Sequence, residues 1–526
     1  KAPVDLIWNG GIGTFVKSAQ ENHADVGDRT NDGIRIDAVE LNAKVIAEGG
    51  NLGLTQLARI EYSLQGGIVN TDFIDNSAGV DCSDHEVNIK ILLNRLMLQG
   101  DMTREQRNKL LEKMTDEVAE LVLLDNYEQT QMLSLEASVS QQTMDLFRQY
   151  MNDLEKEGRL NRRLEYLPDD KTLIERKASN KPLTRPEIAI LLAYSKMYLK
   201  QDILASDVPE EPYFDKYLLA AFPKPLREKY LPEMKEHSLR REIVATQLCK
   251  AIADRMGINF VERLQRETGA STAFIIRAFT IADSLFHMED LWHQITALDY
   301  KVSTHIQYRM MLQIYYLIRR ATRWFLRNRK PNLDIQKTID SFSPSINELI
   351  KHLPQLLDAS DKEAFDAAMG YLTEQGVPEK LARSVACCNT LFTSLDIVES
   401  AQKYELDLFE VAKTYYLLGN RLELNWLREL MNSYVVENQW DELARAGFRD
   451  DLDRVQRKLS ARVLTMKIKD AKTKTIEERI NIWINRYQFL MERWQKLLTD
   501  VKSSDIVGFV TYSVVLRELF DFAQAA

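Results

Sequence analysis

The spacing of apolar residues changes once along this chain, and that change constrains the fold more than any other feature. Within the first 80 residues, three short apolar runs end in glycine- and asparagine-containing loops: Val4–Trp8, Ala43–Glu48 and Gly66–Ile74. Runs of this kind are typical of buried parallel strands. From about Asp84 onward, apolar residues recur at the 3.6-residue spacing of helices. The sequence therefore predicts a mostly α fold with a small α/β part at its N-terminus.

The loops that follow the three apolar runs are candidates for a ligand site. They read NGGIGT, GGN and DNSAG, and little else in the chain resembles them. Ligands of open α/β sheets bind at the carboxyl ends of the strands. We therefore expect the three loops to gather at one edge of the sheet, with their glycines where backbone approaches a ligand.

Helix starts can be predicted at several places in the remainder. Thr103 with Gln106 forms a capping box, and Thr184, Pro186 and Glu187 form another helix start. Further helices are predicted over ranges that include Arg240–Met256, Ser271–Phe286, Tyr300–Asn328, Leu422–Val436 and Ile476–Val501. Prolines such as Pro354 are expected between helices. We predict domains at residues 1–97 and 98–526, with a possible further boundary in the linker-like segment 161–182.

Composition excludes several classes of protein. The 526 residues are 45% hydrophobic and 28% charged, as in globular proteins, and the net charge is −9. An acidic chain is a poor ligand for nucleic acid or membranes, and no apolar run reaches the roughly 18 residues of a membrane helix. The four cysteines lack the spacing of a zinc site, which favours reduced thiols and a cytoplasmic location. The chain begins at Lys1, almost directly in a strand-like run, so we expect a piece of a longer protein.

Two glycine- or aspartate-containing motifs are incomplete. Gly11-Ile12-Gly13 precedes a helix-like stretch, as in a dinucleotide fingerprint, but Val16 stands in place of the third glycine. The stretch DRTNDGIRIDAV begins like a calcium loop, but its twelfth residue is Val39 instead of glutamate. We interpret it as a solvated loop and predict no metal site.

Two charged clusters also have simple structural interpretations. Residues 82–86, CSDHE, are adjacent on a helix and cannot form a catalytic triad, whereas Ser83 with Glu86 has the spacing of a capping box.

The basic stretch Arg319–Lys330 alternates with aromatic residues, as in nucleic-acid sites. Its arginines at 319, 323 and 327 share one helical stripe, with the aromatic residues at 324 and 325 turned away. We therefore expect them to pair with neighbouring Asp and Glu.

Three stretches of the first 90 residues resemble the large bacterial NAD-dependent glutamate dehydrogenases: DLIWNGGIGTF, KVIAEGGNLGLTQLARIEY and NTDFIDNSAGVDCSDHEVNIK. The helical remainder resembles the C-terminal region of that family less specifically. The resemblance implies the C-terminal part of a Rossmann-like NAD-binding catalytic domain followed by a large helical domain. It also implies a cytoplasmic enzyme that converts L-glutamate to 2-oxoglutarate and ammonia.

The resemblance also implies roles for individual residues. Glu48–Asn51 matches the family loop E-G-A-N, with Gly50 in place of alanine, and Asn76–Glu86 matches N-A-G-G-V-x-x-S-x-x-E. Asn51 and Asn76 would approach the nicotinamide end of NAD, Gly10 and Gly11 would line the same pocket, and Ser83 would contact the substrate carboxylate. Ser83 would then lie at the amino end of the helix that it caps, where an anion is favoured.

The family's catalytic lysine and aspartate would lie upstream, so the resemblance implies no catalytic residue in this chain. The partners implied are the substrate, the upstream part of the same chain and further copies in a homo-oligomer, without nucleic acid or membrane. The alternative is a helical assembly or regulatory module with no ligand-binding role of its own. Titration of the chain with NAD distinguishes the two.

Overall fold

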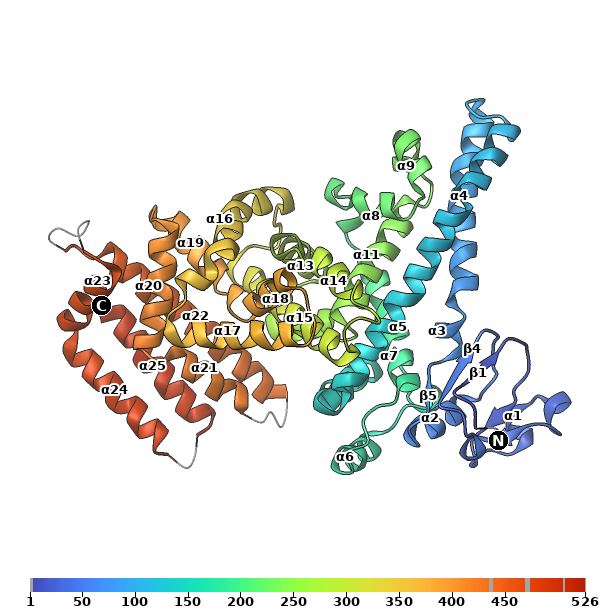
Figure 1. Ribbon diagram of the computed structural model, residues 1–526, viewed down its shortest axis with the longest axis horizontal. Helices are drawn as coiled ribbons and strands as arrows, with labels where there is room; N and C mark the ends of the chain where they lie inside the picture. Colours follow the sequence, from blue (N-terminus) through green and yellow to red (C-terminus); the bar gives the residue numbers. More distant parts are fainter. Residues whose placement is uncertain (1–2, 435–438, 469–473, 505–506, 526) are drawn as a thin grey trace. The chain divides into compact units, whose positions relative to one another are not determined.

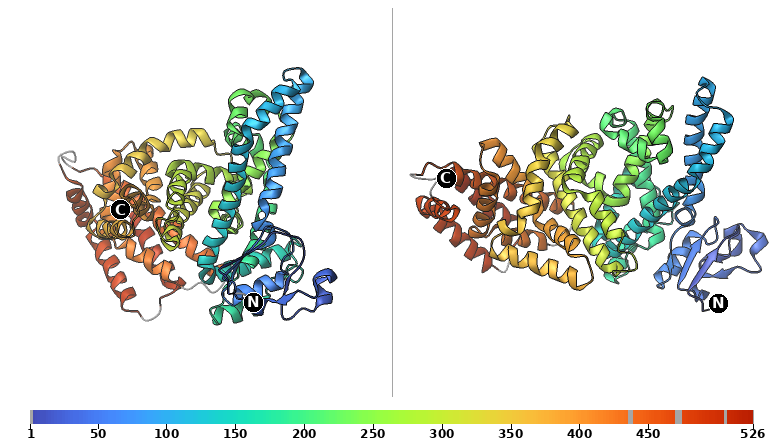
Figure 2. Two further views of the ribbon diagram at one scale, coloured as in Figure 1. Left: turned by 45° about the vertical axis from the view of Figure 1, so that its right-hand side comes forward. Right: turned by 45° about the horizontal axis from the view of Figure 1, so that its top comes forward.

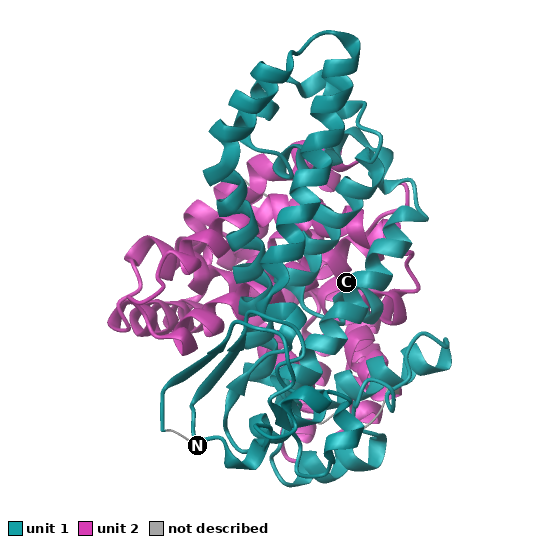
Figure 3. Cartoon of the chain, turned by 90° about the vertical axis from the view of Figure 1, so that its right-hand side faces the viewer, with its two compact units in different colours: residues 1–263 teal, residues 264–526 magenta. Residues whose placement is uncertain are grey.

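The protein divides into two compact units, residues 1–263 and residues 264–526 (Figure 3). The computed structural model describes residues 3–434, 439–468, 474–504 and 507–525. In this part of the chain all regular structure after residue 69 is helical, which confirms the mostly α fold. The boundary predicted after residue 97 stays a prediction.

Unit 1 begins with a three-stranded parallel sheet in the order β1 (Leu6–Asn9), β4 (Val45–Glu48), β5 (Ile68–Val69) (Figure 1). A second, two-stranded parallel sheet joins β2 (Val16–Lys17) to β3 (Ile36–Asp37). The predicted parallel strands are confirmed, and the small sheet fits the remnant of a Rossmann-like domain. The third run is shorter than expected, because its end forms the helix α3 (Asp72–Asp75).

The three-stranded sheet has one covered face and one open face. Ile46 and Val69 point to the covered face and form a core with Ala58 and Tyr62 of α2 (Gln56–Leu64). On the opposite face, three apolar side chains of the strands are more than half exposed: Leu6 (55%), Trp8 (63%) and Ile68 (52%). The register places Leu6, Val45 and Ile68 in one row, so these side chains share the open face. Parallel sheets are usually covered on both faces.

Two long helices, α4 (Ser77–Gln99) and α5 (Arg104–Lys156), run side by side in unit 1 (Figures 1 and 2). The capping box of Thr103 and Gln106 starts α5, and that of Thr184 and Glu187 starts α7 (Arg185–Leu204), as predicted. The linker-like segment contains α6 (Asp170–Ala178). The remaining helices of unit 1 are α1 (His23–Val26), η1 (Arg29–Asn31), η2 (Ala38–Glu40), η3 (Val208–Glu210), η4 (Pro212–Phe214), α8 (Asp215–Ala220), α9 (Lys224–Lys229), α10 (Leu231–Lys235) and α11 (Arg240–Met256).

Unit 2 is helical throughout its described residues, and α12 (Phe260–Thr268) contains the boundary between the units. Its helices are α13 (Thr272–Phe286), α14 (Met288–Thr296), α15 (Thr304–Asn328), α16 (Ile335–Leu356), α17 (Ala359–Glu374), α18 (Glu379–Leu391), α19 (Ser394–Tyr404), α20 (Leu408–Arg421), α21 (Leu424–Ser433), α22 (Gln439–Thr465), α23 (Ile476–Arg486), α24 (Gln488–Lys502) and α25 (Phe509–Ala525). None of the described helices combines the length and apolar character needed to cross a membrane.

Three helix predictions in unit 2 need correction or limits. The single helix predicted over Ile476–Val501 is two helices, because Tyr487 leaves helical geometry between α23 and α24. Pro354 lies inside α16 and not between helices. The burial of Leu349 and Leu353 in that helix offsets the backbone hydrogen bond that proline removes. The last two residues of the helix predicted to end at Val436 lie outside the described residues.

Candidate functional site

The loops that follow β1, β4 and β5 meet at one edge of the sheet, as predicted. The carbonyl oxygen of Asn9 accepts hydrogen bonds from the backbone N–H groups of Gly49 (2.9 Å) and Gly50 (3.1 Å). The side-chain Nδ2 of Asn76 donates to the carbonyl oxygen of Gly50 (3.2 Å) and to Oδ1 of Asn51. The two asparagines named from the sequence therefore lie side by side, beside the loop that begins at Gly10.

Close backbone contact between two of these loops requires glycine at position 50. A Cβ atom there would come within 3.0 Å of the carbonyl carbon of Gly11, and closer still to its oxygen. Gly10 and Gly11 are themselves exposed. The glycine that replaces the family's alanine therefore brings the second loop directly against the first.

A buried ion pair holds the loop that carries Asn51. Glu48, at the end of β4, is fully buried and accepts hydrogen bonds from Nε (2.7 Å) and Nη2 (3.0 Å) of Arg59 in α2. The same carboxylate accepts from the backbone N–H of Leu54 (3.1 Å). Burial raises the pKa of Glu48, and the hydrogen bonds and charge of Arg59 oppose that rise. Glu48 and Arg59 thus fix the loop to the helix that follows it.

Ser83 does not cap a helix, so that prediction is wrong. The helix α4 begins at Ser77, and Ser83 lies six residues inside it, roughly 9 Å along the axis. Its hydroxyl donates to the carbonyl oxygen of Gly79 (3.3 Å), one turn back. The early start depends on α5, because Asn126 Nδ2 donates to the carbonyl oxygen of Ile74 and to Oγ of Ser77 (both 2.9 Å).

Ser83 nevertheless shares a helix face with the converging loops. Asn76, Val80 and Ser83 are separated by four and three residues, so they lie on one side of the first two turns of α4. Val80 is 67% exposed and Ser83 is exposed. This face offers a carboxamide, an apolar surface and a hydroxyl in succession.

The two incomplete motifs have structural roles. The helix-like stretch after Gly13 is the strand β2, so that expectation is wrong and no helix follows the two glycines as a dinucleotide fingerprint needs. In the calcium-like loop, Asp28 accepts from the backbone N–H of Thr14 (2.9 Å) and Nδ2 of Asn31 (2.6 Å). Arg35 pairs with Asp32 (2.5 Å). These side chains hold the loop together, in agreement with the structural interpretation.

A cluster that the sequence analysis missed joins α4 to α5. Asp81, His85 and Asp125 bring possible metal-ligating atoms within 4.8 Å of one another, with 3.9 Å between His85 Nε2 and Asp81 Oδ1. Burial, followed by the charge of Asp125, raises the pKa of Asp81 to about 7, while burial lowers the pKa of His85. The ammonium of Lys250 contacts Asp125 and supplies a positive charge.

The sequence contained only part of the signal for this cluster. Asp81 and His85 are four residues apart on one helix, and this spacing indicates that their side chains are neighbours. Their partner Asp125 comes from another helix, which no local pattern indicates.

Comparison with known proteins identifies the family. Residues 180–521 match the family described as "Glutamate dehydrogenase, C-terminal", and residues 1–136 match "Bacterial NAD-glutamate dehydrogenase, catalytic domain". The chain belongs to the bacterial NAD-glutamate dehydrogenase family. The resemblance seen in the loops around Asn51 and Asn76 is thereby confirmed for the whole chain.

Relatives named NAD-specific glutamate dehydrogenase align along the full chain. The protein of Pseudomonas aeruginosa is 47% identical over 526 residues, that of Halomonas elongata 46% over 522 residues, and that of Mycobacterium tuberculosis 37% over 519 residues. These alignments cover 99–100% of this chain and 32% of each relative. The chain thus spans about a third of the length of these glutamate dehydrogenases.

Proposed function

We propose that this chain forms one wall of the active site of an NAD-dependent glutamate dehydrogenase. The full protein would oxidise L-glutamate to 2-oxoglutarate and ammonia, with hydride transfer to NAD. The observation that carries the proposal is the meeting of three strand-end loops, with the carboxamides of Asn51 and Asn76 in contact. Ligand sites of open α/β sheets occupy this position.

The residues at this edge fit the nicotinamide end of NAD. Asn76 uses its Nδ2 on Gly50 and Asn51, so its Oδ1 and the Nδ2 of Asn51 are the groups that can face a ligand. A nicotinamide carboxamide needs one acceptor and one donor, and these two groups supply both. Gly10 and Gly11 leave the adjacent backbone exposed for a planar ring. Bound NAD would accept the hydride, and this chain's residues would orient its ring.

The start of α4 suits the substrate carboxylate. The helix dipole favours an anion near the N-terminus of α4 but falls off within the first turn, so at Ser83 the hydroxyl itself has to supply the contact. We propose that Ser83, on the same helix face as Asn76, turns its hydroxyl from the carbonyl oxygen of Gly79 and donates a hydrogen bond to that carboxylate. Val80 would contact the aliphatic part of the substrate.

The rest of the active site would come from the upstream part of the full chain. We propose that the lysine and aspartate used for acid–base chemistry lie there, so this chain alone is expected to form no NADH from glutamate and NAD. The open apolar face of the sheet supports an upstream layer that covers it. A cytoplasmic homo-oligomer remains part of the proposal.

Two variants of the full-length enzyme test the assignment. Asn51→Ala should raise the KM for NAD more than that for glutamate, because a polar group of the cofactor loses its partner. Ser83→Ala should raise the KM for glutamate by about ten- to a hundredfold and leave that for NAD nearly unchanged, as expected for a lost hydrogen bond to a charged group. Steady-state kinetics with each substrate varied in turn measures both effects.

A matched control separates ligand contact from helix stability. Ser513→Ala removes another exposed helical hydroxyl with the same one-turn-back hydrogen bond, to Phe509, and should leave both constants unchanged. If Ser83→Ala behaves like Ser513→Ala, Ser83 does not contact glutamate. If Asn51→Ala leaves KM and kcat for NAD unchanged, Asn51 lies outside the cofactor site.

A further inference from the structure

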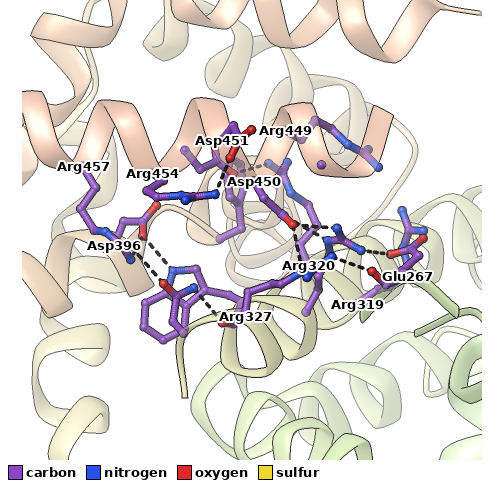
Figure 4. A pocket seen from close by; sticks show the side chains of 16 residues that line it. Glu267, Arg319, Arg320, Arg327, Asp396, Arg449, Asp450, Asp451, Arg454 and Arg457 are labelled. Atoms are coloured by element: carbon purple, nitrogen blue, oxygen red, sulfur yellow. Dashed lines mark hydrogen bonds and ion pairs between the residues drawn. The ribbon is translucent and has the colours of Figure 1, made fainter. Parts of the chain in front are cut away.

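A cavity of about 460 Å³ between α15 and α22 of unit 2 is lined by seven arginines and five carboxylates (Figure 4). We call it the arginine cavity. Its arginines on α15 include the stripe of Arg319, Arg323 and Arg327 predicted from the sequence, and Trp324 also lines it, although it was expected to turn away. Most of the labelled side chains come from α15 and α22, and α12 and α19 add Glu267 and Asp396 (Figure 4).

Four of the five carboxylates pair closely with arginines that line the cavity. Asp450 pairs with Nε (3.0 Å) and Nη2 (2.6 Å) of Arg323, which also contacts Glu267. Asp396 accepts from Nη1 of Arg457 (2.7 Å), and Asp451 pairs with Arg454. This part of the cavity is an ion-pair network of the kind the sequence predicts, and it is confirmed as such.

Two arginines are less completely paired among the residues that the structure describes. The fifth carboxylate, Asp453, already accepts from Nε (3.0 Å) and Nη2 (2.9 Å) of Arg428, and Nη2 of Arg320 lies 3.7 Å from it. The guanidinium of Arg320 instead lies over the ring of Phe392. The described partner of Arg449 is neutral: its Nη1 donates to Oδ1 of Asn432 (3.2 Å).

The electrostatic environment agrees with a local surplus of positive charge. Burial, followed by the charges of Arg319 and Arg320, lowers the pKa of Arg449 to about 9, and burial lowers that of Arg320 to about 10. Both side chains remain charged at neutral pH, so they repel each other. An ion-pair network that served only stability would hardly gather such charges in one cavity.

We propose that the arginine cavity binds a small, multiply charged anion through Arg320 and Arg449. Guanidinium groups bind carboxylate and phosphate oxygens bidentately, so both kinds of anion match the cavity's chemistry. Its volume suits a small molecule. The neighbouring carboxylates pair with the other arginines and add negative charge to the cavity. A monoanion would therefore gain too little electrostatic attraction to offset the free energy of removing its hydration shell. This site lies in unit 2 and does not depend on the cofactor loops.

Isothermal titration calorimetry and thermal melting of the 526-residue chain test the proposal with two probes, inorganic pyrophosphate and the tricarboxylate tricarballylate. At low ionic strength at least one probe should bind and raise Tm, and added salt should weaken the binding. The probe that binds identifies the phosphate or the carboxylate class. If neither probe binds at about 10 mM, the affinity is too weak for a functional site and the proposal is wrong.

Two variants locate the site. Arg449→Gln removes the charge, and Arg320→Lys keeps the charge but loses the guanidinium fork. Each should weaken binding of the active probe about tenfold or more. Without ligand, Arg449→Gln should melt at or above the wild-type temperature, because it relieves repulsion. If it fails to fold, Arg320→Lys decides the question.

The control is Arg517→Gln, which removes an exposed arginine of α25 that does not line the cavity. It should bind the probe with wild-type affinity. If Arg449→Gln or Arg320→Lys, once shown to be folded by circular dichroism, binds as tightly as Arg517→Gln, the anion does not bind in the arginine cavity and the proposal is wrong.

Discussion

At the scale of single residues, the sheet edge that carries the candidate cofactor site depends on position 50, where no side chain fits. Gly50 touches the backbone of Gly11, and this contact sets how closely the first two strand-end loops approach. The carboxamides of Asn51 and Asn76 then sit against the same loop through the Gly50 carbonyl. A change of one methyl group at position 50 should therefore be felt at both asparagines.

Gly50→Ala is expected to lower the free energy of unfolding by about 1–3 kcal/mol, because the added methyl group must displace the loop of Gly11. Chemical denaturation of the chain, with hydrogen exchange to localise the effect, measures this. Gly79→Ala is the matched control. It has open space around the added Cβ and lies in α4, so it should raise stability by roughly 0.5–1 kcal/mol. Equal effects of the two substitutions would contradict the proposed contact.

The carboxyl group of Asp81 gives a prediction about pH. Its pKa is raised to about 7 in the folded chain, chiefly by burial and then by Asp125, from the ordinary value of 3.8. Between these two values the folded state binds a proton that the unfolded state lacks. The contribution of Asp81 to stability therefore falls as pH rises from about 4 to 7 and is constant above that.

Asp81→Asn should remove this dependence. The difference in Tm between the variant and wild type should grow in favour of the variant from pH 5 to pH 7 and then level off, as differential scanning fluorimetry can show. Glu86→Gln removes an exposed carboxylate of the same helix that is not among the charges acting on Asp81, and it should leave the pH profile of wild type unchanged. Parallel profiles for wild type and Asp81→Asn would show that Asp81 does not titrate between pH 5 and pH 7 in the folded chain.

At the scale of elements, one buried ion pair connects a strand, a loop and two helices. Glu48 of β4 pairs with Arg59 of α2, and Arg59 Nη2 lies 3.3 Å from Asp72 at the start of α3. Because α3 leads directly into Asn76, the same pair supports both loops that carry the candidate cofactor contacts.

Arg59→Leu should destabilise this region by about 3–5 kcal/mol at pH 8, because it leaves the charge of Glu48 buried without its partner. The loss should become smaller as the pH falls, because burial raises the pKa of Glu48 and the variant lacks the Arg59 charge that opposes this rise. Hydrogen exchange at Val45–Glu48 measures the effect. The double variant Glu48→Gln with Arg59→Leu should recover a large part of the stability. If the single and double variants exchange equally fast, the ion pair is not the cause.

At the scale of the whole molecule, the open face of the sheet bears on the proposal that this chain forms part of a longer enzyme, such as the relatives that it matches over 32% of their length. Leu6, Trp8 and Ile68 expose more than half of their surface in an otherwise ordinary parallel sheet. In the proposed full-length enzyme, an upstream segment would cover these side chains and complete the active site.

Leu6→Ser should leave the stability of this chain within about 0.5 kcal/mol of wild type, as for other exposed positions. In the full-length protein the same substitution should cost about 2–3 kcal/mol, because the leucine would be buried there. Ile46→Ser, on the covered face of the neighbouring strand, should be destabilising in both proteins. Thermal melting compares them. An unchanged full-length protein would show that no upstream layer covers this face.

Features encoded by local periodicity could be predicted from the sequence alone. The strands and the helices that start at Thr103 and Thr184 follow from spacing and capping residues within a few positions of one another. The convergence of the strand-end loops follows from the geometry of parallel sheets, and Asn51 and Asn76 were named from the family resemblance. These patterns depend on backbone geometry within each segment, so they are predicted well wherever contacts with distant segments do not override them.

Only the tertiary structure decided the features that depend on contact between distant segments. Ser83 has the spacing of a cap, but side chains of α5 hold the start of α4 at Ser77 and place Ser83 inside the helix. Asp81 meets Asp125, and Arg320 meets Arg449, across pairs of helices. The packing of helices far apart in the sequence decides which residues are buried together and which charges are paired. Local spacing carries no information about that packing.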